Sequence, residues 1–182
     1  MNYVESNMDF SPLSEASNFF YVEKSKFYQK LKSQRLRSVE FLYTYEQEKG
    51  SYLVFLEAKE TAPDSSVSMR DISLLKSMKL VVYYEEIYEK LHHTLNMLLS
   101  KELGNTVDEC QEWPIAITAN YIKNNQLLFI LVIKETEPAW ARAVKTALED
   151  KLRPLMGLWQ LKIMVMSGET ALAKGLVSAV LA

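Results

Sequence analysis

The sequence contains few of the residues on which several classes of protein depend. Its 182 residues include a single cysteine, Cys110, so a disulfide within the chain and a multi-cysteine zinc site are both excluded. The five glycines are not clustered, so the chain has no glycine-rich loop for phosphate binding. A reducing compartment is the simplest explanation for one cysteine, and we expect a cytoplasmic protein.

Long apolar runs and a strong net charge are also missing. The longest apolar run, Leu127–Ile133, has seven residues, whereas a membrane-spanning helix needs about 20. The first residues, MNYVESNMDFSP, include acids and no apolar core, so we expect neither a signal peptide nor a membrane partner. The formal net charge is −2, so any contact with nucleic acid must come from a local basic patch.

The spacing of apolar residues changes between strand and helix periods along the chain. It predicts five strands, of which the first four form two hairpins, over 38–46 with 51–59, 114–122 with 126–135, and 159–166. It predicts helices over about 14–34 and 69–103, from Pro138 to Pro154, and a closing helix or tail over 167–182. We therefore expect one α/β domain with a mixed five-stranded sheet flanked by helices, an N-terminal extension over 1–13 and a core over 14–166.

The second predicted strand ends in an acid and a base, because YLVFLEAK runs from apolar residues into Glu57 and Lys59. Residues two apart in a strand share one face, so these two side chains are expected side by side. The same spacing at Glu149 and Lys151 lies in a predicted helix, where residues two apart point to nearly opposite sides. Only the first pair therefore predicts a joint site, and a cross-strand ion pair at the edge of the sheet would explain it equally.

The neighbouring strand brings a second acid, Glu40, to the same face. A two-residue hairpin loop at 48–49 would place Glu40 opposite Glu57, and one at 49–50 would place it opposite Lys59. Two adjacent carboxylates repel each other, and a hard divalent cation such as Mg²⁺ or Mn²⁺ would relieve that repulsion. A three-residue loop would reverse the relation, and Glu40 would then be a solvated strand residue.

A third acid, Glu23, lies in the first predicted helix, in one row with Phe19, Phe27 and Leu31. An ionised group in an apolar row is costly unless it is paired or bound to a metal. If this row packs on the first hairpin, Glu23 approaches the same site. The alternative is a solvated residue near the edge of the row.

A helix with Glu23, a hairpin with Glu40 and then Glu57-x-Lys59, and a further helix with more strands resemble the PD-(D/E)XK nuclease-like superfamily over about 15–135. The resemblance implies a restriction-endonuclease-like sandwich in which Glu23, Glu40 and Glu57 hold Mg²⁺ or Mn²⁺. It assigns Glu57 and Lys59 to the catalytic acid-x-Lys positions. The chain departs from the family pattern because Glu40 replaces the common aspartate and no Pro-Asp pair precedes Glu57-x-Lys59.

The segment KSKFYQKLKSQRLR has basic residues and no acid, which makes it the best candidate for phosphate contacts in this chain. Its six basic residues are Lys24, Lys26, Lys30, Lys32, Arg35 and Arg37. A solvated helix face would explain the same pattern. His92 and His93 are adjacent, so on a helix they diverge and do not form a chelating pair.

These observations predict a Mg²⁺-dependent nuclease that hydrolyses phosphodiester bonds in nucleic acid. A second hypothesis is a nuclease-like fold without catalysis that binds protein partners, which the missing aspartate and the acidic composition favour. A third is a subunit that acts only within a larger complex. The apolar helix over 69–103 would also suit a homo-oligomer interface.

Overall fold

The computed structural model of the chain describes residues 3–16, 18–47, 50–63, 74–104, 112–114 and 117–181. The strands are β1 (Val4–Glu5), β2 (Met8–Asp9), β3 (Phe20–Tyr21), β4 (Phe41–Gln47), β5 (Gly50–Thr61), β6 (Gln126–Glu135), β7 (Lys162–Ser167) and β8 (Ala179–Val180). The α-helices are α1 (Lys26–Leu31), α2 (Leu74–Glu102), α3 (Ala119–Asn124), α4 (Pro138–Trp159) and α5 (Gly168–Ala173). Three short 3-10 helices are η1 (Ser11–Glu15), η2 (Val22–Lys24) and η3 (Lys32–Gln34). No helix in this part of the chain combines the length and hydropathy of a bilayer-spanning segment.

The main sheet has five strands in the order β3-β4-β5-β6-β7, and it is mixed, as the sequence predicts. Strand β4 runs antiparallel to both of its neighbours, β3 and β5, whereas β6 runs parallel to β5 and β7 runs parallel to β6. The helices α2 and α4 provide the crossovers that parallel neighbours require. The coarse expectation of an α/β domain with helices beside a mixed sheet is confirmed.

The predicted second hairpin is wrong. The side chain of Thr118 caps α3 by accepting a hydrogen bond from the backbone N–H of Tyr121, so residues 119–124 are helical. Strand β6 instead lies between β5 and β7, and its almost continuous apolar sequence suits a strand buried on both faces. The fifth strand of the sheet is β3, which is too short to produce a recognisable alternation.

The predicted helix over 14–34 is also wrong, because this segment breaks into η1, β3, η2, α1 and η3. Asn18 adopts a left-handed conformation with φ of 57°, which a continuing helix does not permit. Ser25 then starts α1 by accepting a hydrogen bond from the backbone N–H of Tyr28. The boundaries of other elements shift as well, since Pro154 lies inside α4 rather than at its end. The predicted helix over 69–103 corresponds to α2, with 69–73 outside the described residues.

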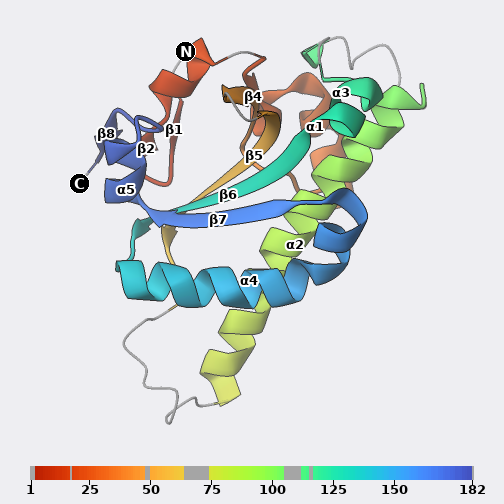
Figure 1. Cartoon of the computed structure of the whole chain (residues 1–182). Helices are drawn as coiled ribbons and strands as arrows, with labels where there is room; N and C mark the ends of the chain where they lie inside the picture. Colours follow the sequence, from red (N-terminus) through yellow and green to blue (C-terminus); the bar gives the residue numbers. More distant parts are fainter. Residues whose placement is uncertain are drawn as a thin grey trace.

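The two faces of the sheet are covered by different parts of the chain, as Figure 1 shows. Leu53 and Phe55 of β5 pack in the core formed with α2 and α4. Val54 and Leu56 point the other way, toward the segments near the two chain ends. There β2 pairs with both β1 and β8, so the predicted extension and tail meet in a three-stranded sheet.

Gly168 stands where α5 approaches the end of β6. A Cβ atom at this position would lie 3.1 Å from the carbonyl oxygen of Lys134 and 3.2 Å from its Cα, and these backbone atoms belong to the buried sheet. We expect Gly168→Ala to lower the free energy of unfolding by about 1–3 kcal/mol because of this overpacking. Urea denaturation measures the change.

Gly157 in α4 provides the matched control, because a Cβ there meets nothing within 4 Å. Gly157→Ala is expected to raise the free energy of unfolding by about 0.5–1 kcal/mol, as for any helix-interior glycine. Equal effects of the two substitutions would contradict the proposed contact between α5 and β6.

Candidate functional site

The register of the β4–β5 hairpin brings the acidic residues of the two strands together. Phe41 lies opposite Leu56 and Gln47 lies opposite Gly50, which corresponds to the two-residue loop at 48–49. Glu40 directly precedes β4, and its carboxylate Oε2 accepts a hydrogen bond from the backbone N–H of Ala58 in β5. The prediction that Glu40 and the Glu57/Lys59 pair share one face is therefore confirmed.

Helix α2 covers this face and adds the ammonium group of Lys90 at its centre. The Lys90 Nζ lies 2.7 Å from Glu57 Oε1 and 3.4 Å from both Glu40 Oε1 and Glu23 Oε1. The Lys59 Nζ lies 3.2 Å from Glu57 Oε1. Three carboxylates from η2, β5 and the residue before β4 thus converge on one lysine from a helix.

Glu86 completes this arrangement from the next turn of α2. Its Oε1 lies 2.7 Å from Lys59 Nζ, and positions 86 and 90 are neighbours on the helix surface because they are four residues apart. We call Glu23, Glu40, Glu57, Lys59, Glu86 and Lys90 the carboxylate–lysine cluster. Ile87 and Leu91, which are buried on the same side of α2, hold this part of the helix against the sheet.

The cluster has a buried floor and a more exposed rim. The side chains of Glu57, Glu40 and Lys90 are 0%, 6% and 11% exposed, whereas those of Lys59, Glu23 and Glu86 are 19%, 27% and 32% exposed. At the floor, Glu57 Oε2 is buried and has no hydrogen-bond partner among the described residues, and the same is true of the nearby Tyr83 hydroxyl. Unsatisfied buried polar atoms are rare in native proteins.

The charges of the cluster do not balance, because four carboxylates face two ammonium groups. Burial, followed by the charge of Glu57, raises the pKa of Glu40 well above its usual range, although Lys90 and the Ala58 N–H act in the opposite direction. Burial alone would lower the pKa of Lys90, but the charges of Glu57, Glu40 and Glu23 outweigh burial and raise it. Lys90 is therefore charged, and burial beside Glu57 disfavours the ionised form of Glu40.

At the rim, the pKa of Glu86 shifts in the opposite direction to that of Glu40, whereas the pKa of Lys59 rises like that of Lys90. Burial would raise the pKa of Glu86, but the hydrogen bond and charge of Lys59 outweigh it and lower the pKa. Burial would also lower the pKa of Lys59, but the charge of Glu57 outweighs it and raises the pKa. A further acid, Glu5 of β1, lies close enough that burial and then the charge of Glu23 raise its pKa. The rim of the cluster therefore carries both signs of charge.

The basic segment from Lys24 to Arg37 is exposed but is only partly connected to the cluster. Arg37 contacts Glu89 at 3.3 Å and Glu86 at 4.0 Å, which brings it to the rim. Lys24 follows Glu23 in η2 and lies over the ring of Tyr21 at 5.6 Å. The others are distributed over α1 and the residues beside it, where Lys26 pairs with Glu112; they are Lys26, Lys30, Lys32 and Arg35.

Lys90 and Glu86 are the residues that sequence analysis missed. Both lie in a helix whose apolar residues dominate the pattern. The signal that could have revealed them is a Glu–Lys pair four residues apart beside Ile87 and Leu91.

His92 and His93 have separate contacts and do not form a pair of ligands. His92 stacks on Tyr88, and His93 Nδ1 accepts a hydrogen bond from the backbone N–H of Arg37. Cys110 lies outside the described residues.

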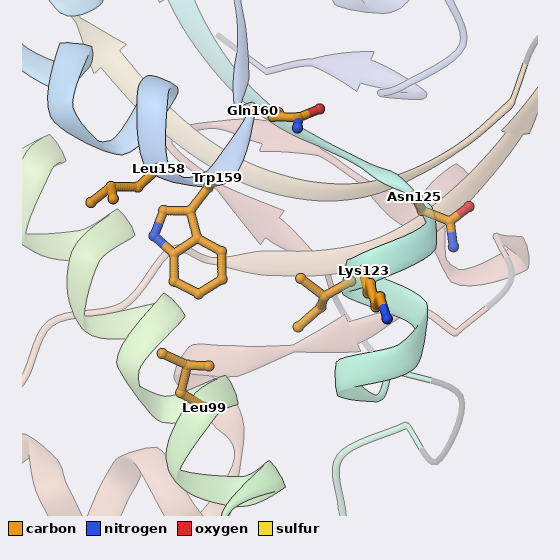
Figure 2. A pocket seen from close by; sticks show the side chains of 7 residues that line it. Leu99, Lys123, Asn125, Leu158, Trp159 and Gln160 are labelled. Atoms are coloured by element: carbon orange, nitrogen blue, oxygen red, sulfur yellow. The ribbon is translucent and has the colours of Figure 1, made fainter.

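Two cavities lie apart from the cluster. One of about 340 Å³ is formed where α2, α3 and the end of α4 meet, and Figure 2 shows Leu99 and Trp159 on one side of it and Lys123 on the other. The other, of about 600 Å³, lies on the sheet face that points away from the carboxylate–lysine cluster. No residue that lines either cavity belongs to the carboxylate–lysine cluster.

The carboxylate–lysine cluster differs from a preformed metal site. Within the described ranges, no three or more His, Cys, Asp or Glu residues are grouped in a way that could hold a metal ion. The Lys90 ammonium lies among the carboxylates, at distances typical of ion pairs rather than of metal ligands.

Comparisons with protein-family models, with curated proteins and with solved structures found no match to this chain.

Replacement of Lys90 tests whether its charge holds the cluster together. We expect Lys90→Met to lower the free energy of unfolding by about 3–5 kcal/mol, because it leaves buried carboxylates without a partner. Chemical denaturation near neutral pH measures the loss. Lys79→Met, at an exposed position of the same helix, is the control and should change stability by less than about 0.5 kcal/mol. Similar values for the two variants would refute a structural role of the Lys90 charge.

Replacement of Glu40 tests whether its pKa is raised, because the raised pKa makes the stability of the protein depend on pH. The folded-state pKa of Glu40 is raised above 4.5, so the contribution of this carboxyl to stability is fully present below 4.5 and is lost as pH rises through the raised pKa. Glutamine has no such titration. The stability of Glu40→Gln relative to the unchanged protein should therefore rise as the pH increases from 4.5 toward neutrality in urea denaturation. A relative stability that falls over this range would contradict the assignment.

Proposed function

We propose that the carboxylate–lysine cluster is the centre of a Mg²⁺- or Mn²⁺-dependent phosphodiester hydrolase with a restriction-endonuclease-like fold. The observation that carries the proposal is the convergence of Glu40, Glu57 and Lys59 on one sheet face, with Glu23 beside them. These are the residues that the family resemblance assigns to metal binding and catalysis. The antiparallel β3-β4-β5 unit, followed by a helix and the parallel strand β6, supports the same resemblance.

The donor groups of the cluster fit a hard divalent cation. Such ions prefer carboxylate oxygens and need only one or two from the protein. Glu57 Oε2 is buried and has no hydrogen-bond partner among the described residues, and burial followed by the charge of Glu57 raises the pKa of Glu40. Glu40 and Glu57, with Glu23, would hold the ion after the Lys90 ammonium has withdrawn. When bound, the ion would activate water and stabilise charge on the phosphate.

Other residues in and beside the cluster have separate roles in this proposal. The Ala58 N–H fixes the orientation of the Glu40 carboxylate. Lys59 is partly exposed at the rim, where its ammonium can act as a point charge on a phosphate oxygen. Arg37 and Lys24 lie nearest to the cluster among the basic residues and would contact the nucleic-acid backbone. A cytoplasmic location fits the single cysteine.

A non-catalytic binding module is the second candidate, and the position of Lys90 favours it. The ammonium already compensates part of the charge of Glu23, Glu40 and Glu57 without a metal ion. A buried ion cluster of this kind can serve to fix the fold. The protein would then act through its surface, alone or as a subunit of a larger complex.

Activity measurements distinguish the two candidates. Single- and double-stranded DNA and RNA are incubated with the protein in Mg²⁺ or Mn²⁺, and cleavage is followed on gels. We expect metal-dependent cleavage that falls by about 10²-fold or more in Glu57→Gln and in Lys59→Met, because each removes a charge that acts in the transition state. Glu149→Gln, from the other acid-x-Lys pair, is the control; Glu149 is partly exposed on α4, where it pairs with Lys145, and this variant should retain full activity.

Binding of Mn²⁺ provides a measurement that does not depend on the substrate. We expect calorimetry to detect one ion, with affinity lost in Glu57→Gln and kept in Glu149→Gln. In Lys90→Met the ion should restore part of the lost stability, because it binds the folded state only. Absence of Mn²⁺ binding in both the unchanged protein and Lys90→Met would reject the hydrolase and leave the binding module.

A further inference from the structure

The larger cavity lies on the sheet face opposite the carboxylate–lysine cluster and has a volume of about 600 Å³. Its floor is formed by β4, β5, β6 and β7, where the terminal segments leave part of the sheet uncovered. One row of paired residues crosses all four strands, from Tyr43 through Val54 and Leu128 to Lys162. Leu13 of η1 and the segment that follows α5 line the sides of the cavity.

The floor of this cavity is apolar and adaptable. Beside Val54 and Leu128 it includes Ile130 and two methionines, Met164 and Met166. Met164 is 38% exposed although it stands in the middle of a strand. Methionine side chains adjust their shape to different apolar ligands, so this surface suits the body of an organic molecule.

The polar groups of the cavity all favour a negatively charged ligand. Lys162 and Lys174 line it, no acid does, and neither lysine forms an ion pair with any residue that the structure describes. The Lys162 ammonium lies over the ring of Tyr52 at 5.5 Å. The Tyr43 side chain is 3% exposed, and its hydroxyl makes no hydrogen bond within the described residues. The hydroxyl is therefore a donor available to a ligand.

We propose that this cavity binds a small organic anion with an apolar body, of which a medium-chain carboxylate is the simplest example. The apolar body would lie on the floor of the sheet, and the carboxylate would contact Lys162 and Lys174 at the rim, with the Tyr43 hydroxyl as a donor. A volume of about 600 Å³ is in the usual range for small-molecule sites. The ligand would lie one sheet away from the proposed catalytic centre, so this site is independent of hydrolase activity.

Decanoate is the probe for this proposal, and its binding to the full chain is measured by isothermal titration calorimetry below its micelle concentration. We expect saturable binding of one decanoate, with a Kd below about 1 mM, that weakens as salt is added. Acetate has the same head group without the apolar body, and decyltrimethylammonium has the same body with the opposite charge. Both should bind at least about tenfold more weakly than decanoate, a difference of about 1.4 kcal/mol.

Substitutions at the rim locate the bound anion. Lys162→Met and Lys174→Met keep an apolar stem but remove the charge, and the double variant should raise the Kd for decanoate about tenfold or more. Lys79→Met removes an exposed lysine from α2, on the other side of the sheet, and should leave the Kd unchanged. Circular dichroism verifies that each variant is folded.

Three results would overturn the proposal. These are no saturable decanoate binding, equal binding of decyltrimethylammonium, which indicates apolar adsorption alone, and an equal loss of affinity in Lys79→Met. Because none of these measurements uses nucleic acid or a divalent ion, their outcome is separate from that of the hydrolase experiments.

Discussion

The contact between Lys90 and Glu57 joins the long helix to the centre of the sheet. Glu57 stands on a central strand with no exposed surface, and an ionised carboxylate in that position requires a positive partner. Lys90 supplies the charge from α2 at 2.7 Å. The same ammonium contacts Glu40 and Glu23, so one group ties together α2, β5, the start of β4 and η2.

The chemistry of the site depends on which cation compensates these carboxylates. The Lys90 ammonium is part of the chain, so it loses no translational freedom when it joins the cluster. A divalent ion brings twice the charge but must first displace the ammonium. The proposed hydrolase and the proposed binding module would therefore share one geometry and differ in which of the two cations occupies it. The sheet also divides the molecule, because a charged cluster lies beneath α2 and an apolar cavity with a basic rim lies on the other face.

Particular residues show how far sequence analysis reached. Glu40, Glu57 and Lys59 could be placed together because strand residues alternate between faces and a two-residue loop sets the register. Glu23 also lies in the cluster, but it does so from a 3-10 turn and not from the long helix that the apolar row predicts. The strand predicted over 114–122 is wrong at 119–122, because Thr118 caps a short helix that begins at 119.

The sequence by itself determined the alternation of β5 and, for either two-residue hairpin loop, the shared face of three charged residues, whereas the structure selected the register. These are consequences of local geometry between residues that are close along the chain. Only the tertiary structure decided that Lys90 would meet Glu57, which is 33 residues away, and that the chain ends would meet through Asp9 and Ser178, which are 169 residues apart. Such contacts depend on how helices and end segments pack on the sheet, and residue periodicity indicates which face is apolar but not what covers it.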